Sequence, residues 1–224
     1  MNKMRQLIVI PARLSSWRFP NKPLTDLLSM PMFEHVYRRS ELVSNIDDIV
    51  LALCDKELYD IAVNKGMKAI MTSNEHKTAC ERVAEASQIM GYTSHDDIVI
   101  NVQADEPVVP PPVIEMTRDL LLSKNTNNCA NLVEHITDTN ELNNRHRVKA
   151  ILSVNNNLIF LSRESVPSTF FDINKLTTFY RLTCITAYRG PFLQQYYKLS
   201  RTPIELIEGN DMMRVIEHDI QIPS

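Results

Sequence analysis

The chain has 224 residues, 44% of them hydrophobic, so it can bury a core of ordinary size, and we expect one globular domain. A charged fraction of 23% and a formal net charge of -3 provide no overall positive field, which argues against nucleic acid or a membrane surface as a partner. The four cysteines (Cys54, Cys80, Cys129 and Cys184) contain no CxxC pair, and the N-terminal apolar run is too short for a signal peptide or a membrane span. These features predict a cytoplasmic protein with reduced thiols.

Short apolar runs alternate with helix-forming segments through the first half of the chain. The run at 6–10, which ends at Pro11, is typical of a strand buried on both faces of a parallel sheet. Asp55 and Gly66 are suitable start and stop residues for a helix between them. The same patterns predict further strands over 49–53, 68–72, 98–102 and 130–133, and further helices over 32–43, 78–90 and 112–122.

This alternation predicts an α/β fold with a mostly parallel, doubly wound, Rossmann-like sheet that is covered by helices on both faces. Ligands of such sheets bind at the carboxyl ends of the strands. The pattern then changes, because 148–154 and 158–162 are strand-like and three asparagines between them suit a hairpin turn. We expect 148–190 to form an excursion from the single domain whose apolar face packs on a second copy of the chain, giving a homodimer.

A basic loop, PARLSSWRFPNKPL, follows the first predicted strand. Its cations Arg13, Arg18 and Lys22, together with backbone N–H groups, could hold a polyphosphate. Pro20 and Pro23 stiffen the loop and so lower the cost of ordering it around a ligand. The alternative is a solvated basic loop without a ligand. The loop is not a Walker loop, because the chain contains no GxxxxGK[ST] pattern.

Two carboxylates follow the predicted strand at 98–102, in the segment NVQADEP. One carboxylate and the phosphates of a nucleotide suffice for Mg²⁺, which keeps several of its waters. Asp105 is therefore the candidate metal ligand. The alternative is that Asp105 and Glu106 only cap the turn before Pro107.

Four motifs occur in the order found in the bacterial 3-deoxy-manno-octulosonate cytidylyltransferases, and the resemblance covers nearly the whole chain. IPARLSSWRFPNKPL resembles the family's PAR-x-x-S-x-R-x-P-x-KPL, and MTSNEHKTACER resembles MT-x-x-x-H-x-SGT-[DE]-R. NVQADEP is similar to NVQGDEP, and FLSRESVP to YFSR-x-x-IP. FYRLTCITAYR and LIEGNDMMRVIEHDIQI match more weakly. The resemblance implies a nucleotide-diphospho-sugar transferase fold and a reaction of CTP with an acidic sugar, with Mg²⁺ as cofactor.

The resemblance also implies roles for individual residues. Arg18, Lys22 and Asp105 would be catalytic, and Asp105 would carry the metal. Arg163 would pair with the carboxylate of the sugar. The implied nucleotide-binding residues are Pro11, Ala12, Arg13, Ser16, Arg18, Lys22, Thr78, Ala79, Arg82 and Gln103, and the implied sugar-binding residues are Gln103, Arg163, Tyr188 and Glu208. His76 matches a motif position, and a structural histidine is the alternative there.

The chain departs from the family pattern at several positions. Glycines of the family motifs are replaced by Asn21, Ser29, Ala79, Ala104, Cys184 and Ala187. Cys54, Leu182, Thr186 and Asp211-Met212 replace aspartate, histidine, tyrosine and Glu-Gln, so we expect a more apolar sugar pocket. The chain ends at Ser224, before the family's GVDTPEDL segment, whose first aspartate helps to bind magnesium. Either the sequence is truncated there or the protein has lost part of its catalytic apparatus, and the second case would give a catalytically impaired nucleotide-binding or regulatory homologue. A uridylyl- or general nucleotide-binding protein is a further alternative, because base choice depends on backbone contacts that the sequence does not show.

Overall fold

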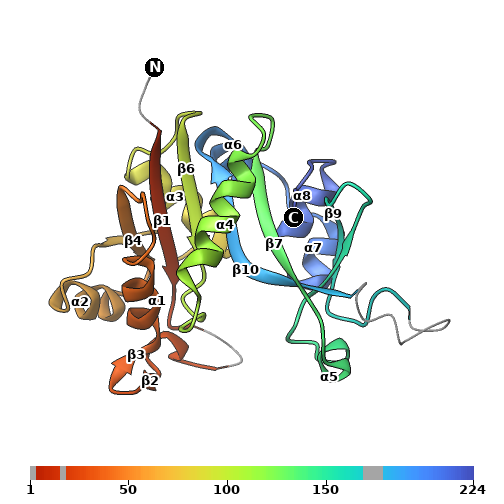
Figure 1. Cartoon of the computed structure of the whole chain (residues 1–224). Helices are drawn as coiled ribbons and strands as arrows, with labels where there is room; N and C mark the ends of the chain where they lie inside the picture. Colours follow the sequence, from red (N-terminus) through yellow and green to blue (C-terminus); the bar gives the residue numbers. More distant parts are fainter. Residues whose placement is uncertain (1–3, 16–18, 169–178) are drawn as a thin grey trace. The chain divides into compact units, whose positions relative to one another are not determined.

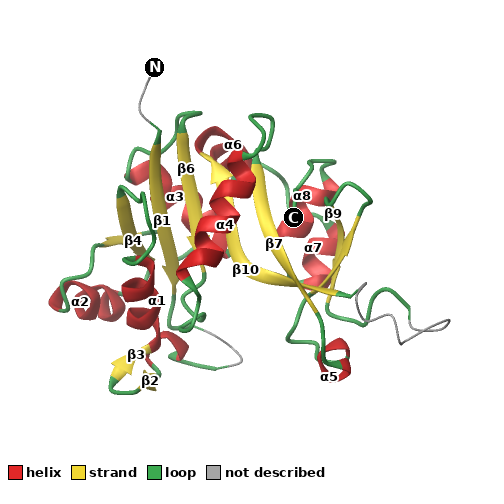
Figure 2. Cartoon of the chain, in the orientation of Figure 1, coloured by secondary structure: helices red, strands yellow, loops and turns green. Residues whose placement is uncertain are grey.

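The structure is a computed structural model that describes residues 4–15, 19–168 and 179–224 (Figures 1 and 2). It contains two compact units. Unit 1 comprises Met1–Asp119 and Cys184–Lys198, and unit 2 comprises Leu120–Thr183 and Leu199–Ser224. Unit 2 is larger than the predicted excursion at 148–190, and the expectation of a single domain stays a prediction.

A mostly parallel sheet forms the centre of unit 1, as the sequence predicted. Its strands are β1 (Arg5–Ala12), β4 (Asp48–Leu53), β5 (Ala69–Met71), β6 (Asp97–Val102) and the last residues of β10 (Tyr180–Arg189). β1 lies between β4 and β6 and is parallel to both, whereas β10 is antiparallel to β6. The centre of β1, Leu7 to Ile10, has no exposed surface. An uninterrupted apolar run is therefore buried on both faces, as a central parallel strand requires.

Helices cover both faces of this sheet. They are α1 (Met32–Ser40), α2 (Lys56–Asn64), α3 (Ala79–Ile89), α4 (Pro111–Leu122) and α6 (Gly190–Tyr196). α3 packs on β1, β4 and β6 and also contacts α6. On the other side, Arg118 of α4 donates to the carbonyl of Ser44 at 2.8 Å, close to the end of α1. In Figure 1, α4 passes in front of the strands and α3 lies behind them, so the expected doubly wound arrangement is confirmed.

An ion pair joins the amino ends of β1 and β6. Arg5 donates two hydrogen bonds of 2.9 Å to the carboxylate of Asp97, whose side chain is only 1% exposed. Burial raises the pKa of this carboxyl, but the hydrogen bonds from Arg5 and Ser94 together lower it by more. The net pKa therefore lies below the ordinary 3.8.

This lowered pKa predicts that Asp97 contributes to the acid sensitivity of the fold and that Asp97→Asn should reduce it. Because the folded-state pKa is depressed, the ionised Asp97 contributes stability above pH 3.8, and that contribution disappears as the pH falls through the folded-state value. We expect Asp97→Asn to be less stable at pH 7 but to lose less stability between pH 5 and pH 3. Urea unfolding of both proteins across this interval measures the difference, and parallel pH dependences would contradict the prediction.

A short hairpin in unit 1 has an unfavourable turn. β2 (Asp26–Leu27) pairs antiparallel with β3 (Met30–Pro31), and the two connecting residues, Leu28 and Ser29, have φ of 52° and 66°. Two positive φ values define a type I′ turn, which favours Asn-Gly. Leucine is strained in this conformation, and its side chain is 95% exposed, so it buries little surface in return.

We expect the double substitution Leu28→Asn, Ser29→Gly to stabilise the chain by about 1 kcal/mol, because it relieves this backbone strain. The midpoint of urea unfolding measures the gain. Leu28→Ala is the matched control, since it removes the exposed apolar side chain and keeps a strained residue at the position. An equal gain from the control would contradict the backbone explanation.

Unit 2 contains antiparallel strands and short helices. They are β7 (Cys129–His135), α5 (Thr139–Leu142), β8 (Lys149–Leu152), β9 (Leu158–Ser162), the first residues of β10, α7 (Pro203–Glu208) and α8 (Met212–Glu217). β8 and β9 form the predicted hairpin, and Asn156 has a φ of 55° in its turn. α7 and α8 pack on each other, and α8 packs on β9. The β8–β9 pairing is the hairpin expected between 148 and 162, whereas the role of 148–190 as a dimerisation excursion stays a prediction, and residues 169–178 lie outside the described residues.

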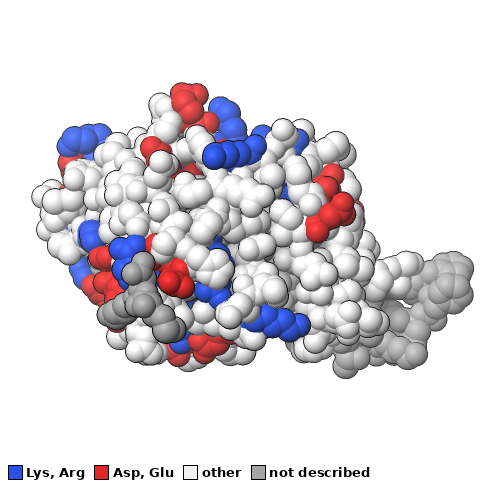
Figure 3. Space-filling model, turned by 90° about the horizontal axis from the view of Figure 1, so that it is seen from above, with Lys and Arg blue, Asp and Glu red and all other residues white. Residues whose placement is uncertain are grey.

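The surface shows both signs of charge. On the face in Figure 3, lysine and arginine side chains are interspersed with aspartates and glutamates. Across the described residues, no helix has both the length and the apolar character that crossing a membrane needs.

Candidate active site

The basic loop is closed at its base in unit 1. The N–H of Asn21 donates to the carbonyl of Leu14 at 3.1 Å, and the N–H of Leu14 donates to the Asp55 carboxylate at 2.8 Å. Asp55 stands at the N-cap of α2, but its side chain makes no cap hydrogen bond there, so its carboxylate serves the loop instead of the predicted cap. The two bonds hold both ends of the loop beside the carboxyl end of β4. Arg13 is exposed, and the predicted Ser16 and Arg18 lie outside the described residues.

An ion pair connects the basic loop to the turn after β6. Lys22 opens a 3-10 helix (Lys22–Leu24), and its Nζ contacts Oδ2 of Asp105. The turn itself is closed by a backbone bond of 3.2 Å from the N–H of Glu106 to the carbonyl of Gln103. The Asp105 carboxylate therefore faces a cation of the loop. Sequence motifs that are 83 residues apart thus meet at the carboxyl ends of β1 and β6.

The donor set around Asp105 is small. Within the described ranges, no group of three or more His, Cys, Asp or Glu side chains could hold a metal ion. The Asp105 side chain is 43% exposed and can therefore reach a ligand that arrives from solvent. One accessible carboxylate fits an ion that takes its other ligands from phosphates and water, as Mg²⁺ does, and does not fit an all-protein metal cage.

The first turn of α3 carries three of the predicted nucleotide-binding residues. Thr78 is the N-cap and forms a capping box with Glu81, with a bond of 3.3 Å in each direction. Ala79 follows as the first helical residue and is half-buried. Arg82 is only 3% exposed and donates to the hydroxyl of Thr72 at 2.7 Å and the carbonyl of Ser73 at 3.1 Å. The observed bonds of Arg82 thus hold the segment after β5, and its contact with a nucleotide stays a prediction.

Glu85 is a residue of this region that the sequence analysis missed. Its carboxylate accepts the N–H of Ser73 at 2.8 Å and contacts Nε2 of His76 at 2.5 Å. His76 is buried, with Tyr197 edge-on to its ring, which supports the structural interpretation of this histidine. The signal for Glu85 was the spacing of three residues from Arg82, which places both on the same face of α3.

Two predicted sugar-binding residues belong to unit 1. Gln103 is half-buried in the turn after β6. Tyr188 of β10 has no exposed surface, its hydroxyl lies 2.8 Å from the sulfur of Cys80, and its ring stacks on Phe192. The observed contacts of Tyr188 are core packing, and a contact with a sugar stays a prediction.

The other two, Arg163 and Glu208, meet in unit 2. The Arg163 N–H donates to the Glu208 carboxylate at 2.8 Å, and its Nε donates to the Glu208 carbonyl at 2.7 Å. Ser162 also donates to the Glu208 carboxylate at 2.9 Å. The end of β9 and the end of α7 therefore build one polar cluster.

The residues that replace family glycines fall into two groups. Asn21 and Ser29 have φ of 58° and 66°, so they retain the left-handed backbone that glycine adopts easily. Ala104 is 7% exposed and has no positive φ, so its methyl group is compatible with the turn.

Cys54, at a family aspartate position, is half-buried, and burial raises the pKa of its thiol above 9.0. A neutral group therefore replaces a charged one there.

A doubly wound, mostly parallel sheet that brings a cationic loop and a carboxylate together at its carboxyl edge is suited to binding a nucleotide, and the comparisons with known proteins place the chain among the nucleotidyltransferases. The family model for cytidylyltransferase matches residues 7–222, and the chain belongs to this family. Among curated proteins it is similar to the 3-deoxy-manno-octulosonate cytidylyltransferase of Francisella tularensis subsp. holarctica (strain LVS), with 38% identity over 220 residues, 96% of this chain and 87% of the relative. The enzyme of the same name from Coxiella burnetii (strain Dugway 5J108-111) is 34% identical over 217 residues, which cover 94% and 86% of the two chains.

Solved structures show the same relationship. A CMP:2-keto-3-deoxy-manno-octonic acid synthetase complexed with CTP matches with a TM-score of 0.88 and 30% identity, over 98% of this chain and 88% of the other. A 4-diphosphocytidyl-2C-methyl-D-erythritol synthase matches with a TM-score of 0.63 and 13% identity, over 100% and 90% of the two chains, and shares the fold. The recognised family and the α/β fold are therefore confirmed.

Proposed function

We propose that the chain is a cytidylyltransferase that converts CTP and 3-deoxy-manno-octulosonate, or a related sugar acid, to the CMP-sugar and pyrophosphate. The product would serve lipopolysaccharide or surface-polysaccharide synthesis. The observation that carries this proposal is the contact of Lys22 with Asp105, which brings the two nucleotide motifs to one edge of the sheet. The names of the similar enzymes and the structure complexed with CTP support the choice of substrates.

The reaction needs positioning and charge neutralisation. The anomeric hydroxyl of the sugar attacks the α-phosphorus of CTP, the bond to the bridging oxygen breaks, and pyrophosphate leaves while the hydroxyl proton passes to solvent. Lys22, Arg13 and Arg18 neutralise phosphate oxygens. The backbone at 11–12 lies along the nucleotide. Arg163 pairs with the sugar carboxylate. Thr78, Ala79, Arg82 and Gln103 border the nucleotide, and Gln103, Tyr188 and Glu208 complete the sugar-binding set.

Asp105 is the proposed magnesium ligand. Its accessible carboxylate supports this role, because a nucleotide-bound Mg²⁺ needs few protein ligands. When bound, the ion supplies neutralisation of phosphate charge. Lys22 contacts the same carboxylate and holds it at the edge of the sheet where the phosphates would lie.

Pyrophosphate release from CTP tests the proposal. Purified chain is incubated with Mg²⁺, CTP and a panel of acidic sugars that includes 3-deoxy-manno-octulosonate, and a reaction without sugar is the control. Sugar-dependent pyrophosphate together with a CMP-sugar product is expected. CTP binding by calorimetry with no product from any sugar would overturn the proposal and favour the impaired nucleotide-binding homologue.

We also propose a cytoplasmic homodimer. The β8–β9 hairpin exposes apolar side chains, with Val154 at 99% and Ile159 at 50% exposure, which supports a partner at this surface. A second copy of the chain is the proposed partner. Light scattering at micromolar concentration should give the mass of a dimer, and a monomer would contradict this proposal.

A further inference from the structure

A buried lysine lies beside the Arg163–Glu208 cluster in unit 2. Lys149, the first residue of β8, has no exposed surface. Its ammonium group donates to three backbone carbonyls, those of Asn144 at 2.9 Å, Arg147 at 2.9 Å and Arg163 at 2.7 Å. An ammonium group has three N–H donors, so each has an acceptor.

These carbonyls belong to two separate segments. Asn144 and Arg147 lie in the turn before β8, whereas Arg163 follows β9. Lys149 is paired with Ser162 in the register of the hairpin, next to Arg163 along the chain. The ammonium group therefore ties the 144–147 turn to the backbone that carries Arg163.

The guanidinium of Arg163 also donates to backbone carbonyls, one of which belongs to the 144–147 turn. Its Nη1 donates to the carbonyl of Arg145 at 3.1 Å, and Nη2 donates to that of Gly209 at 3.3 Å. With the bond from Nε to Glu208, three of the roughly five guanidinium N–H groups are used toward described residues. The remaining N–H groups can serve a carboxylate, and one of the carbonyls that set the direction of the guanidinium, that of Arg145, is in the 144–147 turn that Lys149 holds.

The environment of Lys149 disfavours a charged group. Burial lowers the pKa of the Lys149 ammonium, and the nearby Arg163 and Arg145 act in the same direction, against Glu164 and Glu208. A buried charge is costly to desolvate, and here the three carbonyl acceptors offset that cost. The lysine therefore indicates a need for its hydrogen bonds.

We propose that Lys149 is a positioning residue for the sugar acid, because it fixes the 144–147 turn and the Arg163 backbone so that the Arg163 guanidinium is held ready for the carboxylate of the sugar. This inference rests on the proposed function. Lys149 contacts neither substrate in this arrangement and acts through Arg163.

Steady-state kinetics of Lys149→Met test the inference, with the exposed Lys124→Met of the same unit as matched control. We expect the KM for the sugar acid to rise about 10-fold, the size of one weakened charge-assisted hydrogen bond, while the KM for CTP stays nearly constant. Lys149→Arg, which keeps the charge and the donors, should recover part of the loss. Equal changes in both KM values, or no change in a folded variant, would overturn the inference.

Amide hydrogen exchange separates this inference from the proposed function, because it needs no turnover. Lys149→Met should accelerate exchange over 144–148 and 163–165 by about 10-fold or more, and Lys124→Met should not. If the unsubstituted chain forms no CMP-sugar, the proposed function fails, and unchanged exchange in these segments would overturn the role of Lys149. Should Lys149→Met fail to fold, Lys149→Arg is compared with the unsubstituted chain in both measurements, and unaltered sugar KM and exchange would then overturn the inference.

Discussion

Replacing Asp105 by asparagine is expected to lower kcat/KM for CMP-sugar formation by about 100-fold or more, since a metal and its ligand supply several kcal/mol of charge neutralisation. The substitution keeps the size of the side chain and removes its charge. It therefore abolishes the ion pair with Lys22 and weakens the proposed magnesium ligand together.

Two further measurements separate these effects. If Asp105 binds the metal, Asp105→Asn should need a higher Mg²⁺ concentration for half-maximal activity, whereas Lys22→Met should keep the Mg²⁺ requirement and raise the KM for CTP. Glu106→Gln is the matched control, because the neighbouring carboxylate makes no proposed contact, and it should retain kcat/KM. Full activity of Asp105→Asn at low Mg²⁺ would show that the metal ligand lies elsewhere.

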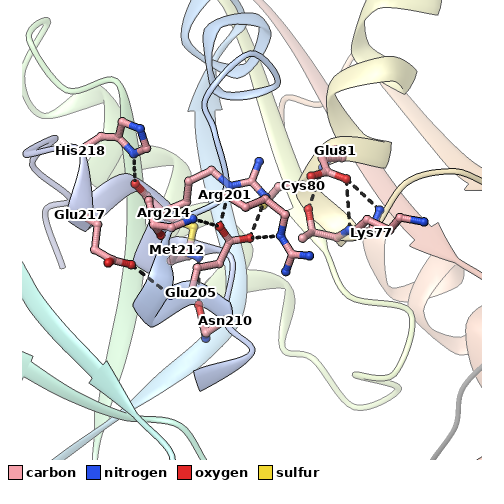
Figure 4. A network of polar contacts seen from close by, with 12 residues as sticks. Lys77, Cys80, Glu81, Arg201, Glu205, Asn210, Met212, Arg214, Glu217 and His218 are labelled. Carbon is pink, nitrogen blue, oxygen red and sulfur yellow. Dashed lines mark hydrogen bonds and ion pairs between the residues drawn. The ribbon is translucent and has the colours of Figure 1, made fainter. Parts of the chain in front are cut away.

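The second large effect is expected on stability, at a buried ion pair in unit 2. Arg214 and Glu205 are each 1% exposed and form two hydrogen bonds, of 2.9 Å and 2.7 Å (Figure 4). Arg201 donates to the same carboxylate at 3.1 Å, and the N–H of Thr202 does so at 3.1 Å in a capping box. Burial raises the pKa of Glu205, but the bonds from Arg214 and Thr202 together lower it by more, so the net pKa lies below 4.5.

Glu205→Gln is expected to lower the free energy of unfolding by about 3–5 kcal/mol, because the buried guanidinium of Arg214 loses its counter-charge. Urea unfolding at neutral pH measures the loss. The double substitution Glu205→Leu, Arg214→Met is the control, since it removes both charges and should be more stable than Glu205→Gln. A loss below about 1 kcal/mol would mean that the pair is solvated and weak.

Local sequence signals predicted most of the elements of unit 1 and the hairpin of unit 2, because these signals lie within the elements that they specify. The apolar run of β1, the capping box at Thr78 and the asparagine turn at Asn156 each act within a few residues. The β2–β3 hairpin was not predicted, because Leu28 and Ser29 are poor residues for a type I′ turn. There the fold imposes a backbone that the local sequence does not favour.

The candidate site could be predicted only in part, for the same reason. Motif spacing identified Lys22 and Asp105, but their contact depends on β1 and β6 being neighbours in the sheet. The roles of Asp55 and Lys149 depend on backbone carbonyls and N–H groups, which have no signature in the sequence. The burial of Tyr188 likewise depends on its contacts with Cys80 of α3 and Phe192 of α6, which its motif does not reveal.

The closed base of the basic loop has a consequence for how position 14 can vary. Asp55 holds Leu14 through its backbone N–H, and Asn21 binds the Leu14 carbonyl, so neither bond depends on the leucine side chain. Natural and engineered sequences should therefore accept many residues at position 14, but they should exclude proline, the one residue without the N–H that anchors the loop. Mutational tolerance would thus be narrow at Asp55, 41 residues away, and wide at the residue that it holds.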